Sequence, residues 1–586
     1  MPLLLEFLLL LLRICGHILL SLIRIVFPKS RRDLKGEVVL ITGGANGIGR
    51  HMAHTFALRG CTVVVLDVDQ AGLDAVKKEL HKEGHVVHCY KCDCSNREQI
   101  YQVAETVRKE VDDVSILVNN AGILIGKKFL DLSDKSIEKV FSVNSLAHFW
   151  TCKAFLPAML KNNKGHIVSI ASVAGLYGAG GLTEYCASKF AAVGFIESLR
   201  QEIRYARKDN VHATLVCPYH VATDLAKGVK ARFPSALQTM QPEFVAERVV
   251  TAVERNEWRV VLPATLSYFI EMTRMLPYQT GMQILFEFLF LLLQICGHML
   301  LSIFRFIIPS SRRDLKGEVV LITGGSSGIG RQMVHAFASH GCTVIVWDID
   351  EEGLDSVKRT LLQEGHVIHC YKCDCSNREE VYGVAERVRV EVNDVSILVN
   401  NAGVVSARKF LDVPDKHVER VMGVNCLAHF WTCKAFLPSM MERNNGHIVT
   451  IASVVGLFGV AGLSEYCASK FAAIGFTESL RQEIRYARKD GVHMTLVCPY
   501  HVGTDLFKGV QARFPSLLQT LDPKDVAERV VTAVERNEWR VILPWSVSLL
   551  IELMRLLPYR SVDAFGDFMG TEHSLDNYSG TSLKDD

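Results

Sequence analysis

Short apolar runs alternate with longer amphipathic stretches along most of this chain of 586 residues. Runs of roughly four to eight residues bounded by turn residues are typical of buried strands, and helical stretches between them favour parallel pairing. We therefore predict an α/β fold with a doubly wound parallel sheet and a crevice at the carboxyl ends of its strands. In the first half of the chain, the expected strands are Glu37–Ile41, Thr62–Leu66, His85–Cys92, Ser115–Val118, His166–Ile170 and Ala213–Val216.

The whole pattern occurs twice. The residues Met1, Gly43, Asp67, Asn144, Ser172, Tyr185 and Pro218 recur 281 positions later as Met282, Gly324, Asp348, Asn425, Ser453, Tyr466 and Pro499. A period of this length is too long for a solenoid repeat, so each copy should be a complete domain with its own core. We predict two Rossmann-type domains, at 29–281 and 310–586, each preceded by an apolar anchor helix, at 1–28 and 282–309.

Each anchor is long enough to span a bilayer, but it carries a polar stripe. Glu6, Arg13, His17 and Arg24 fall on one face of a helix, and Glu287, Gln294, His298 and Arg305 repeat the stripe. Such a stripe suits a helix in the plane of the membrane interface, or two spanning segments that turn their polar faces towards each other or another partner. We favour in-plane or hairpin insertion over a simple span. The basic residues that follow each anchor predict that both domains face the cytosol.

Composition narrows the class of protein. A net charge of +2 gives no indication of nucleic-acid binding. The 17 cysteines, several of them on expected strands, suggest reduced cytosolic thiols rather than a disulfide framework. His85, His88 and Cys89 with Cys92 and Cys94 do not predict a zinc site, because one strand would distribute them over two faces. No metal is expected.

A glycine-rich turn follows the first strand of each copy and opens a helix. Its residues are Gly43, Gly47, Ile48 and Gly49, and in the second copy Gly324, Gly328, Ile329 and Gly330. Glycines let the backbone approach a pyrophosphate, and the helix N-terminus supplies N–H groups and a positive dipole. Asp67 and Asp348 end the next strand, where a carboxylate would bind the adenosine ribose and repel a 2′-phosphate. This favours NAD(H) over NADP(H).

A tyrosine and a lysine four residues apart lie on one expected helix in each copy: Tyr185 and Lys189, Tyr466 and Lys470. An ammonium beside a phenol favours the phenolate, which is what a base working near neutral pH requires. Ser172 and Ser453 stand thirteen residues earlier, at the end of a strand, where a hydroxyl can hydrogen-bond a substrate oxygen. A tyrosine–lysine pair by itself is usually a surface pair, so the other motifs carry the prediction.

In this order and spacing, the glycine turn, Asn-Asn-Ala-Gly, a mid-helix asparagine, the serine and Tyr-x-x-x-Lys resemble the short-chain dehydrogenase/reductase family. The resemblance covers about Glu37–Leu262 and Glu318–Leu543. It implies that tyrosine is the acid/base, that lysine holds the nicotinamide ribose, that serine orients the substrate and that Asn144 or Asn425 holds a water. It further implies cofactor contacts from Asp93, Asn120, Val221 and Thr223, and from Asp374, Asn401, Val502 and Thr504. One departure is Pro-Tyr instead of Pro-Gly at Pro218 and Pro499, which narrows the site beside the nicotinamide.

The anchors and several local sequences are similar to the membrane-bound retinol and 17β-hydroxysteroid dehydrogenase branch of this family. That resemblance implies a lipophilic alcohol, with all-trans-retinol oxidised to retinal, at the endoplasmic reticulum or lipid-droplet surface. The alternatives are an NADP(H)-dependent retinal or ketosteroid reductase and a non-catalytic lipid-droplet scaffold. Two apolar segments, Val260–Leu276 and Val541–Leu557, either border the substrate entrance or are packed terminal helices. Family domains usually pair, so an internal pseudo-dimer or a homo-oligomer is expected.

Overall fold

The computed structural model describes residues 2–226, 239–263, 312–510, 513–514, 519–555, 557–573, 575, 577–580 and 583. Two seven-stranded sheets form the centres of two domains, with strand orders β3-β2-β1-β4-β5-β6-β7 and β10-β9-β8-β11-β12-β13-β14. All neighbouring strands are parallel, so the doubly wound α/β fold is confirmed. The expected second anchor, 282–309, lies outside the described residues.

The strands of the first domain lie close to the predicted runs. They are β1 (Val38–Thr42), β2 (Thr62–Asp67), β3 (Val87–Lys91), β4 (Ile116–Asn119), β5 (Gly165–Ile170), β6 (Val211–Pro218) and β7 (Arg259–Leu262). Their counterparts are β8 (Val319–Thr323), β9 (Thr343–Asp348), β10 (Ile368–Lys372), β11 (Ile397–Asn400), β12 (Gly446–Ile451), β13 (Val492–Pro499) and β14 (Arg540–Leu543). Strands β1, β4 and β5 are almost completely buried, as expected for central parallel strands that read as continuous apolar runs.

The predicted apolar segment Val541–Leu557 contains two elements. Its first residues complete the edge strand β14, and a separate helix, α18 (Trp545–Arg555), begins after Pro544. Val260–Leu262 belongs in the same way to β7, and the remainder of that predicted segment lies outside the described residues. A short edge strand and the helix that follows it form one continuous apolar run in the sequence, because the neighbouring strand that distinguishes them is not visible there.

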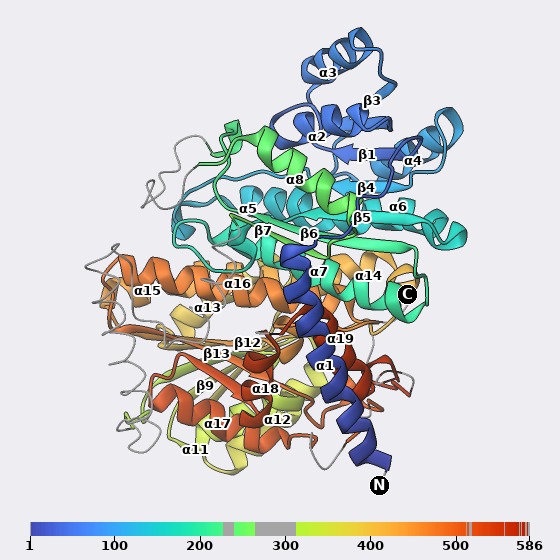
Figure 1. Cartoon of the computed structure of the whole chain (residues 1–586). Helices are drawn as coiled ribbons and strands as arrows, with labels where there is room; N and C mark the ends of the chain where they lie inside the picture. Colours follow the sequence, from blue (N-terminus) through green and yellow to red (C-terminus); the bar gives the residue numbers. More distant parts are fainter. Residues whose placement is uncertain are drawn as a thin grey trace, which may run out of the picture.

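Helices cover both faces of each sheet (Figure 1). One face of the first sheet packs against α2 (Gly47–Leu58), α3 (Gln70–Lys82) and α8 (Pro242–Glu254). The other packs against α4 (Arg97–Glu110), α5 (Asp134–Phe141), α6 (Ala147–Asn162) and α7 (Thr183–Tyr205). The second domain repeats this with α11 (Gly328–Ser339), α12 (Glu351–Gln363) and α17 (Pro523–Glu535), and with α13 (Arg378–Glu391), α14 (Asp415–Met422), α15 (Ala428–Arg443) and α16 (Ser464–Tyr486).

The two domains meet through α7 and α16, which lie against each other at the centre of the molecule (Figure 1). A Cβ added to Gly194 would lie 2.6 Å from the ring of Phe471, and one added to Gly475 would lie 2.5 Å from the ring of Phe190. Each glycine therefore makes room for an aromatic ring of the opposite domain. Buried apolar side chains of both domains form one continuous cluster across this contact. The two copies are thus paired within the chain, and pairing with a second chain stays a prediction.

Polar contacts around this apolar centre come in matched pairs. Lys153 Nζ lies 2.5 Å from Asp415, and Lys434 Nζ lies 2.7 Å from Asp134. Glu202 accepts hydrogen bonds from the backbone N–H groups of Phe410 and Gly462, at 2.8 and 3.1 Å. Glu483 accepts the equivalent bonds from Phe129 and Gly181, at 2.6 and 3.2 Å. The contact is therefore isologous, with a local two-fold axis like that of a symmetric dimer.

The N-terminal helix α1 (Pro2–Val26) packs beside α19 (Tyr559–Met569), which belongs to the C-terminal part of the second domain (Figure 1). Glu6 pairs with Arg513 at 2.6 Å, and the rings of Phe7 and Phe568 lie 6.2 Å apart. The polar stripe of α1 is turned in part towards the protein, since Glu6, His17 and Arg24 are half-buried whereas Arg13 is exposed. The outward face of α1 is apolar, with these residues exposed: Leu5, Phe7, Leu8, Leu9, Leu11, Leu12, Leu19, Leu22 and Ile23.

We expect Gly194→Ala to lower the thermal midpoint of the chain. The added methyl group would overlap Phe471 across the domain contact, and overpacking of this kind costs about 1–3 kcal/mol. The matched control is Gly383→Ala on the exposed side of α13, where nothing lies within 4 Å of the added atom. The control should be neutral or stabilising by about 0.5–1 kcal/mol. Equal midpoints for the two variants, measured by calorimetry, would contradict this account of the contact.

Candidate active sites

The glycine turn of each domain has the backbone shape that the sequence predicts. Gly43 and Gly47 have φ angles of +64° and +53°, in the region that favours glycine. A Cβ on Gly49 would lie 2.1 Å from the carbonyl oxygen of Gly43, so this position excludes a side chain. Ile48 packs against the core beneath α2. The second domain repeats the turn at Gly324, Gly328, Ile329 and Gly330.

The N-terminus of α2 has no side-chain cap. Asn46, which precedes the helix, donates instead to Asp69 at 2.9 Å. Ser327 likewise makes no capping bond to α11. Uncapped N–H groups beside a turn without side chains form a cradle that accepts the phosphates of a dinucleotide. The residues present therefore fit the nucleotide that the motif predicts.

Asp67 lies at the carboxyl end of β2, half-buried beside this turn. Its Oδ2 accepts a hydrogen bond from Ala45 N at 3.0 Å, and its Oδ1 accepts one from Asp69 N at 3.0 Å. Asp348 is held in the same way by Ser326 N, at 3.0 Å, and Asp350 N, at 3.1 Å. Each carboxylate thus has a fixed position at the edge of the cradle.

The other predicted cofactor residues come together along the same edge. Asn120 Nδ2 donates to the carbonyl oxygens of Thr42 and Gly43, both at 2.9 Å, so its amide fixes the turn. Thr223 lies beside Gly47, with its Cγ2 at 3.3 Å from a Cβ built there. The second-domain equivalents Asn401 and Thr504 repeat these contacts, and the preceding residues Val221 and Val502 form isolated bridges to Met240 and Leu521.

Asp93 and Asp374 are already engaged by protein groups. Lys139 Nζ lies 2.8 Å from Asp93 Oδ2, and the N–H and hydroxyl of Ser95 donate to Oδ1 at 2.9 and 2.7 Å. Arg420 contacts Asp374 at 2.6 Å in the second domain. These donors outweigh the effect of burial, so the pKa of each carboxyl lies below its ordinary value. The remaining acceptor positions on each carboxylate can still bind an adenine amino group.

The four expected catalytic side chains of the first domain converge at the crevice. Asn144 is fully buried in the π-helical segment Ser142–Leu146, a helix type frequent at functional sites. Its Oδ1 accepts from Ile123 N at 2.8 Å, and its Nδ2 donates to Ser188 Oγ at 3.0 Å. Lys189 Nζ donates to the carbonyl oxygen of Ile170 at 3.0 Å. A Cβ on Gly122 would meet both Lys189 Nζ and Asn144 Oδ1, at 3.4 and 3.5 Å, so these two groups face one space.

Tyr185 and Lys189 share one face of α7, as predicted, with Nζ 5.8 Å from the centre of the phenol ring. Burial raises the pKa of Tyr185 to about 12, and a hydrogen bond with Ser172 lowers it by less. Burial also lowers the pKa of Lys189 to about 8. The two shifts share one cause, because each charged form has lost its water.

The second domain repeats this geometry with Asn425, Ser453, Tyr466 and Lys470. Lys470 Nζ lies 5.6 Å from the ring centre of Tyr466 and 3.1 Å from the carbonyl oxygen of Ile451. Tyr466 is only 4% exposed, whereas Tyr185 is half-buried. The difference comes from Phe507, whose ring lies 5.4 Å from that of Tyr466, and from Leu575 and Tyr578 of the C-terminal segment. Among the described residues, Tyr466 is therefore more enclosed than Tyr185.

Glu465, which precedes Tyr466, is a buried acid that the sequence did not single out. Its side chain is fully buried, and one carboxyl oxygen accepts from Ser406 N at 3.3 Å. Burial, together with the charge of Glu202 across the domain contact, raises the pKa of Glu465 to about 7. An acid in the first turn of a helix usually interacts with the helix dipole in water, so no sequence signal distinguished this one.

Comparison with known families identifies the class. A model of the short-chain dehydrogenase family matches residues 37–232 and again residues 318–513, which together make up more than half of the chain. The chain therefore belongs to the short-chain dehydrogenase family, with two complete copies of its domain. Members of this family bind NAD or NADP, and both sites have the nucleotide cradle and the catalytic side chains described above.

The particular relatives are retinol dehydrogenases. Epidermal retinol dehydrogenase 2 of Mus musculus is 41% identical over 298 residues, which span 50% of this chain and 96% of that protein. Retinol dehydrogenase 10 of Bos taurus is 39% identical over 321 residues, which span 50% of this chain and 94% of that protein. A solved short chain dehydrogenase/reductase from Burkholderia phymatum in complex with NAD is 27% identical, with a TM-score of 0.38, covering 41% of this chain and 94% of its own. The protein is thus an oxidoreductase related to retinol dehydrogenases.

We expect Glu465→Gln to flatten the dependence of stability on pH. The folded pKa of Glu465 lies above its ordinary value of 4.5, so its contribution to stability is complete below that value and is lost as the pH rises through 7. Thermal midpoints at about pH 5 and about pH 8 should therefore differ less for the variant than for the parent. Glu105→Gln, at an exposed position of α4, is the control and should leave the difference unchanged. Identical pH dependence in all three proteins would refute the assignment.

Proposed function

We propose that the chain is a membrane-associated, NAD-dependent dehydrogenase with two working sites, which oxidises a lipophilic alcohol, most directly all-trans-retinol to all-trans-retinal. The observation that carries the proposal is the convergence of asparagine, serine, tyrosine and lysine beside a nucleotide cradle in both domains. The identity to retinol dehydrogenases supports the choice of substrate. We also propose that the two domains span residues 29–281 and 310–586.

In this mechanism the phenolate oxygen of Tyr185 or Tyr466 accepts the proton of the substrate hydroxyl and becomes the neutral phenol, and NAD, when bound, would supply the hydride acceptor. Lys189 or Lys470 holds the nicotinamide ribose and stabilises the phenolate by its charge. Ser172 or Ser453, which lies at the end of β5 or β12, donates to the substrate oxygen. Asn144 or Asn425 holds the water that passes the proton to solvent. The reverse sequence reduces a carbonyl.

The anionic edge of each cradle supports NAD rather than NADP. Asp67 and Asp348 sit at the end of the second strand of each domain, where a 2′-phosphate would be placed beside a carboxylate. The loop positions at Asn46 and Ser327 provide no cation to neutralise such a phosphate.

The membrane assignment rests on α1. Its segment Leu5–Arg24 has a mean hydropathy of 2.0 with 6% of it buried, and among the described residues it alone is long and apolar enough to cross a bilayer. A lipophilic substrate concentrates in the membrane on which such a helix is anchored. The proposed location is the cytosolic face of the endoplasmic reticulum or of a lipid droplet, for which the anchor is the only physical argument.

Replacement of the catalytic tyrosines tests the two sites separately. Tyr185→Phe and Tyr466→Phe should each retain the turnover of the other site, and the double variant should lose about 100-fold or more, the usual contribution of an acid/base group. The measurement is oxidation of all-trans-retinol by the membrane-embedded chain with NAD⁺. Unchanged turnover in the double variant would exclude these tyrosines, and no turnover of retinol or of an estradiol-type steroid by the parent would favour the scaffold.

Cofactor choice has a separate test in Asp67→Ser with Asp348→Ser. Removal of both carboxylates should lower the KM for NADP⁺ by about tenfold or more, because like charges in contact cost several kcal/mol. Asp112→Ser, at an exposed loop position, is the control. A parent enzyme that prefers NADP⁺ would instead support the reductase alternative.

A further inference from the structure

A cavity of about 850 Å³ adjoins the second active site. Its lining includes Ser453, Tyr500 and Phe507, the last of which packs against Tyr466. Cavities of this size are typical of sites for whole small molecules. Ser453 thus connects the cavity to the second site, whereas Tyr466 and Lys470 are not part of its lining.

The first domain supplies part of the lining of this cavity. Phe190, Val193, Glu197 and Gln201 of α7 line it, together with Trp258 from the loop before β7. The N-terminal helix contributes Ile18, Ser21 and Leu22. All of these residues belong to the first copy, so the second domain does not enclose its own cavity.

The remaining wall is formed by α18 and α19, and α19 is fastened to the first domain. Arg200 of α7 forms a two-pronged ion pair with Asp563 of α19, one bond of which is 3.0 Å, and Gln201 donates to the same carboxylate at 3.2 Å. Both charged side chains are largely buried, at 16% and 12% exposure. The guanidinium also lies 4.6 Å from the ring of Trp258 and 5.0 Å from that of Tyr559. A planar cation between two rings has little freedom to move.

Two further bonds extend the same attachment along the helix. Arg204 pairs with Asp567 at 2.7 Å, and the hydroxyls of Tyr205 and Thr571 lie 2.8 Å apart. Each joins α7 of the first domain to the C-terminal part of the second. The position of α19 is therefore set by the first domain.

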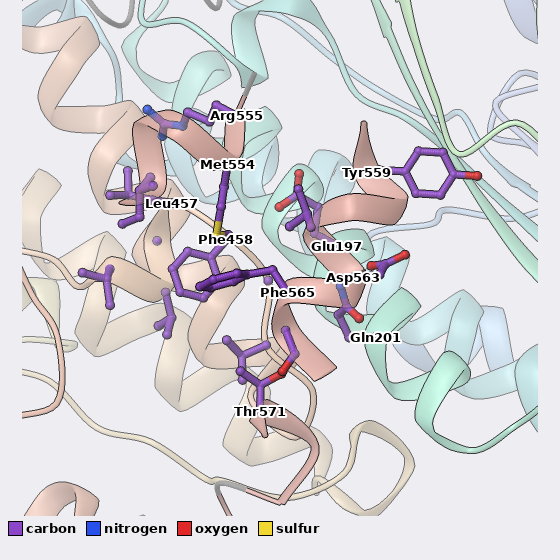
Figure 2. A pocket seen from close by; sticks show the side chains of 18 of the residues that line it. Glu197, Gln201, Leu457, Phe458, Met554, Arg555, Tyr559, Asp563, Phe565 and Thr571 are labelled. Atoms are coloured by element: carbon purple, nitrogen blue, oxygen red, sulfur yellow. Dashed lines mark hydrogen bonds between the residues drawn. The ribbon is translucent and has the colours of Figure 1, made fainter. Parts of the chain in front are cut away.

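The lining is divided by polarity. Figure 2 shows the side chains of Phe458, Met554 and Phe565 gathered on one side, near Leu457, whereas Glu197, Gln201 and Asp563 lie towards the other. Arg555 also lies beside Met554 on the first side, so the lining combines apolar surface for a hydrocarbon with charged groups. This combination suits a lipid alcohol.

We propose that the lipid-binding cavity of the second site is composite. The first domain and α1 complete it, and Arg200 acts as a positioning residue that holds α19 against the bound lipid. The first domain thereby sets the affinity of the second site for its substrate, in addition to its own catalysis. This inference rests on the proposed function for the class of substrate, and on the cavity walls alone for the composite origin of the site. It makes α1 part of the cavity wall as well as the proposed anchor.

The test separates the two sites by their tyrosines. In the Tyr185→Phe chain only the second site works. There, Arg200→Ala should raise the KM for all-trans-retinol by about tenfold with little change in kcat, because the lost contact would stabilise the bound substrate and the transition state equally. In the Tyr466→Phe chain, where only the first site works, the same change should leave KM within about twofold. Asp563→Ala should reproduce the effect on the second site, and Arg200→Lys should restore part of it. Circular dichroism and thermal midpoints establish that each variant is folded.

The matched control is Arg481→Ala. Arg481 is the counterpart of Arg200 in the second copy and stacks on Trp539 at 4.3 Å, but it does not line this cavity. It should leave the KM of the second site unchanged. If Arg200→Ala and Asp563→Ala alter the second site no more than Arg481→Ala does, the composite cavity is refuted.

A binding measurement keeps this inference distinct from the proposed function. The dye 1-anilinonaphthalene-8-sulfonate binds apolar cavities whatever the natural substrate, and the Arg200→Ala chain should bind it more weakly than the Arg481→Ala chain. Weaker dye binding without any retinol turnover by the parent would support the composite cavity and reject retinol. Equal dye binding by the two variants, with normal retinol turnover, would reject the composite cavity and retain the dehydrogenase.

Discussion

The close packing of α7 on α16 is the contact on which the rest of this structure depends. Each helix has a glycine where the other presents a phenylalanine ring, so the two backbones approach closely enough to merge the cores of both domains. The same helices bear Tyr185 with Lys189 and Tyr466 with Lys470. The position of each catalytic pair is consequently fixed from two directions, by its own sheet on one side and by the other domain on the other. The helices that hold the two domains together are therefore the same helices that carry the candidate catalytic residues.

Burial is the second constraint, because it disfavours the charged forms of the candidate tyrosine and lysine in each domain. Each catalytic lysine and tyrosine has exchanged water for protein, which raises the pKa of the phenol and lowers that of the ammonium. A dinucleotide that binds beside them would add hydrogen bonds and charge to the same space.

Covalent fusion has made the two copies unequal although their catalytic residues are the same. Within the described residues, the C-terminal segment of the second copy covers Tyr466 and extends over the first domain through α19. The N-terminal helix packs against α19 of the second domain. Within the described residues, α1 and α19 therefore both lie beside the second site.

The sequence by itself predicted six of the seven strands of the first domain, the glycine turn, the aspartate at the end of the second strand and the four candidate catalytic residues of each copy. These features depend on local backbone shape and on apolar periodicity, both of which can be recognised in consecutive residues. It did not predict the edge strands β7 and β14, because a short apolar run beside a longer apolar segment does not distinguish a strand from a helix. Tertiary structure alone decided that Glu465 is a buried acid, that Arg200 meets Asp563, and that the first domain forms a wall of the second site. Contacts between residues hundreds of positions apart cannot be predicted from the local pattern of apolar and polar residues, because each of these side chains is also compatible with an ordinary position on its own helix.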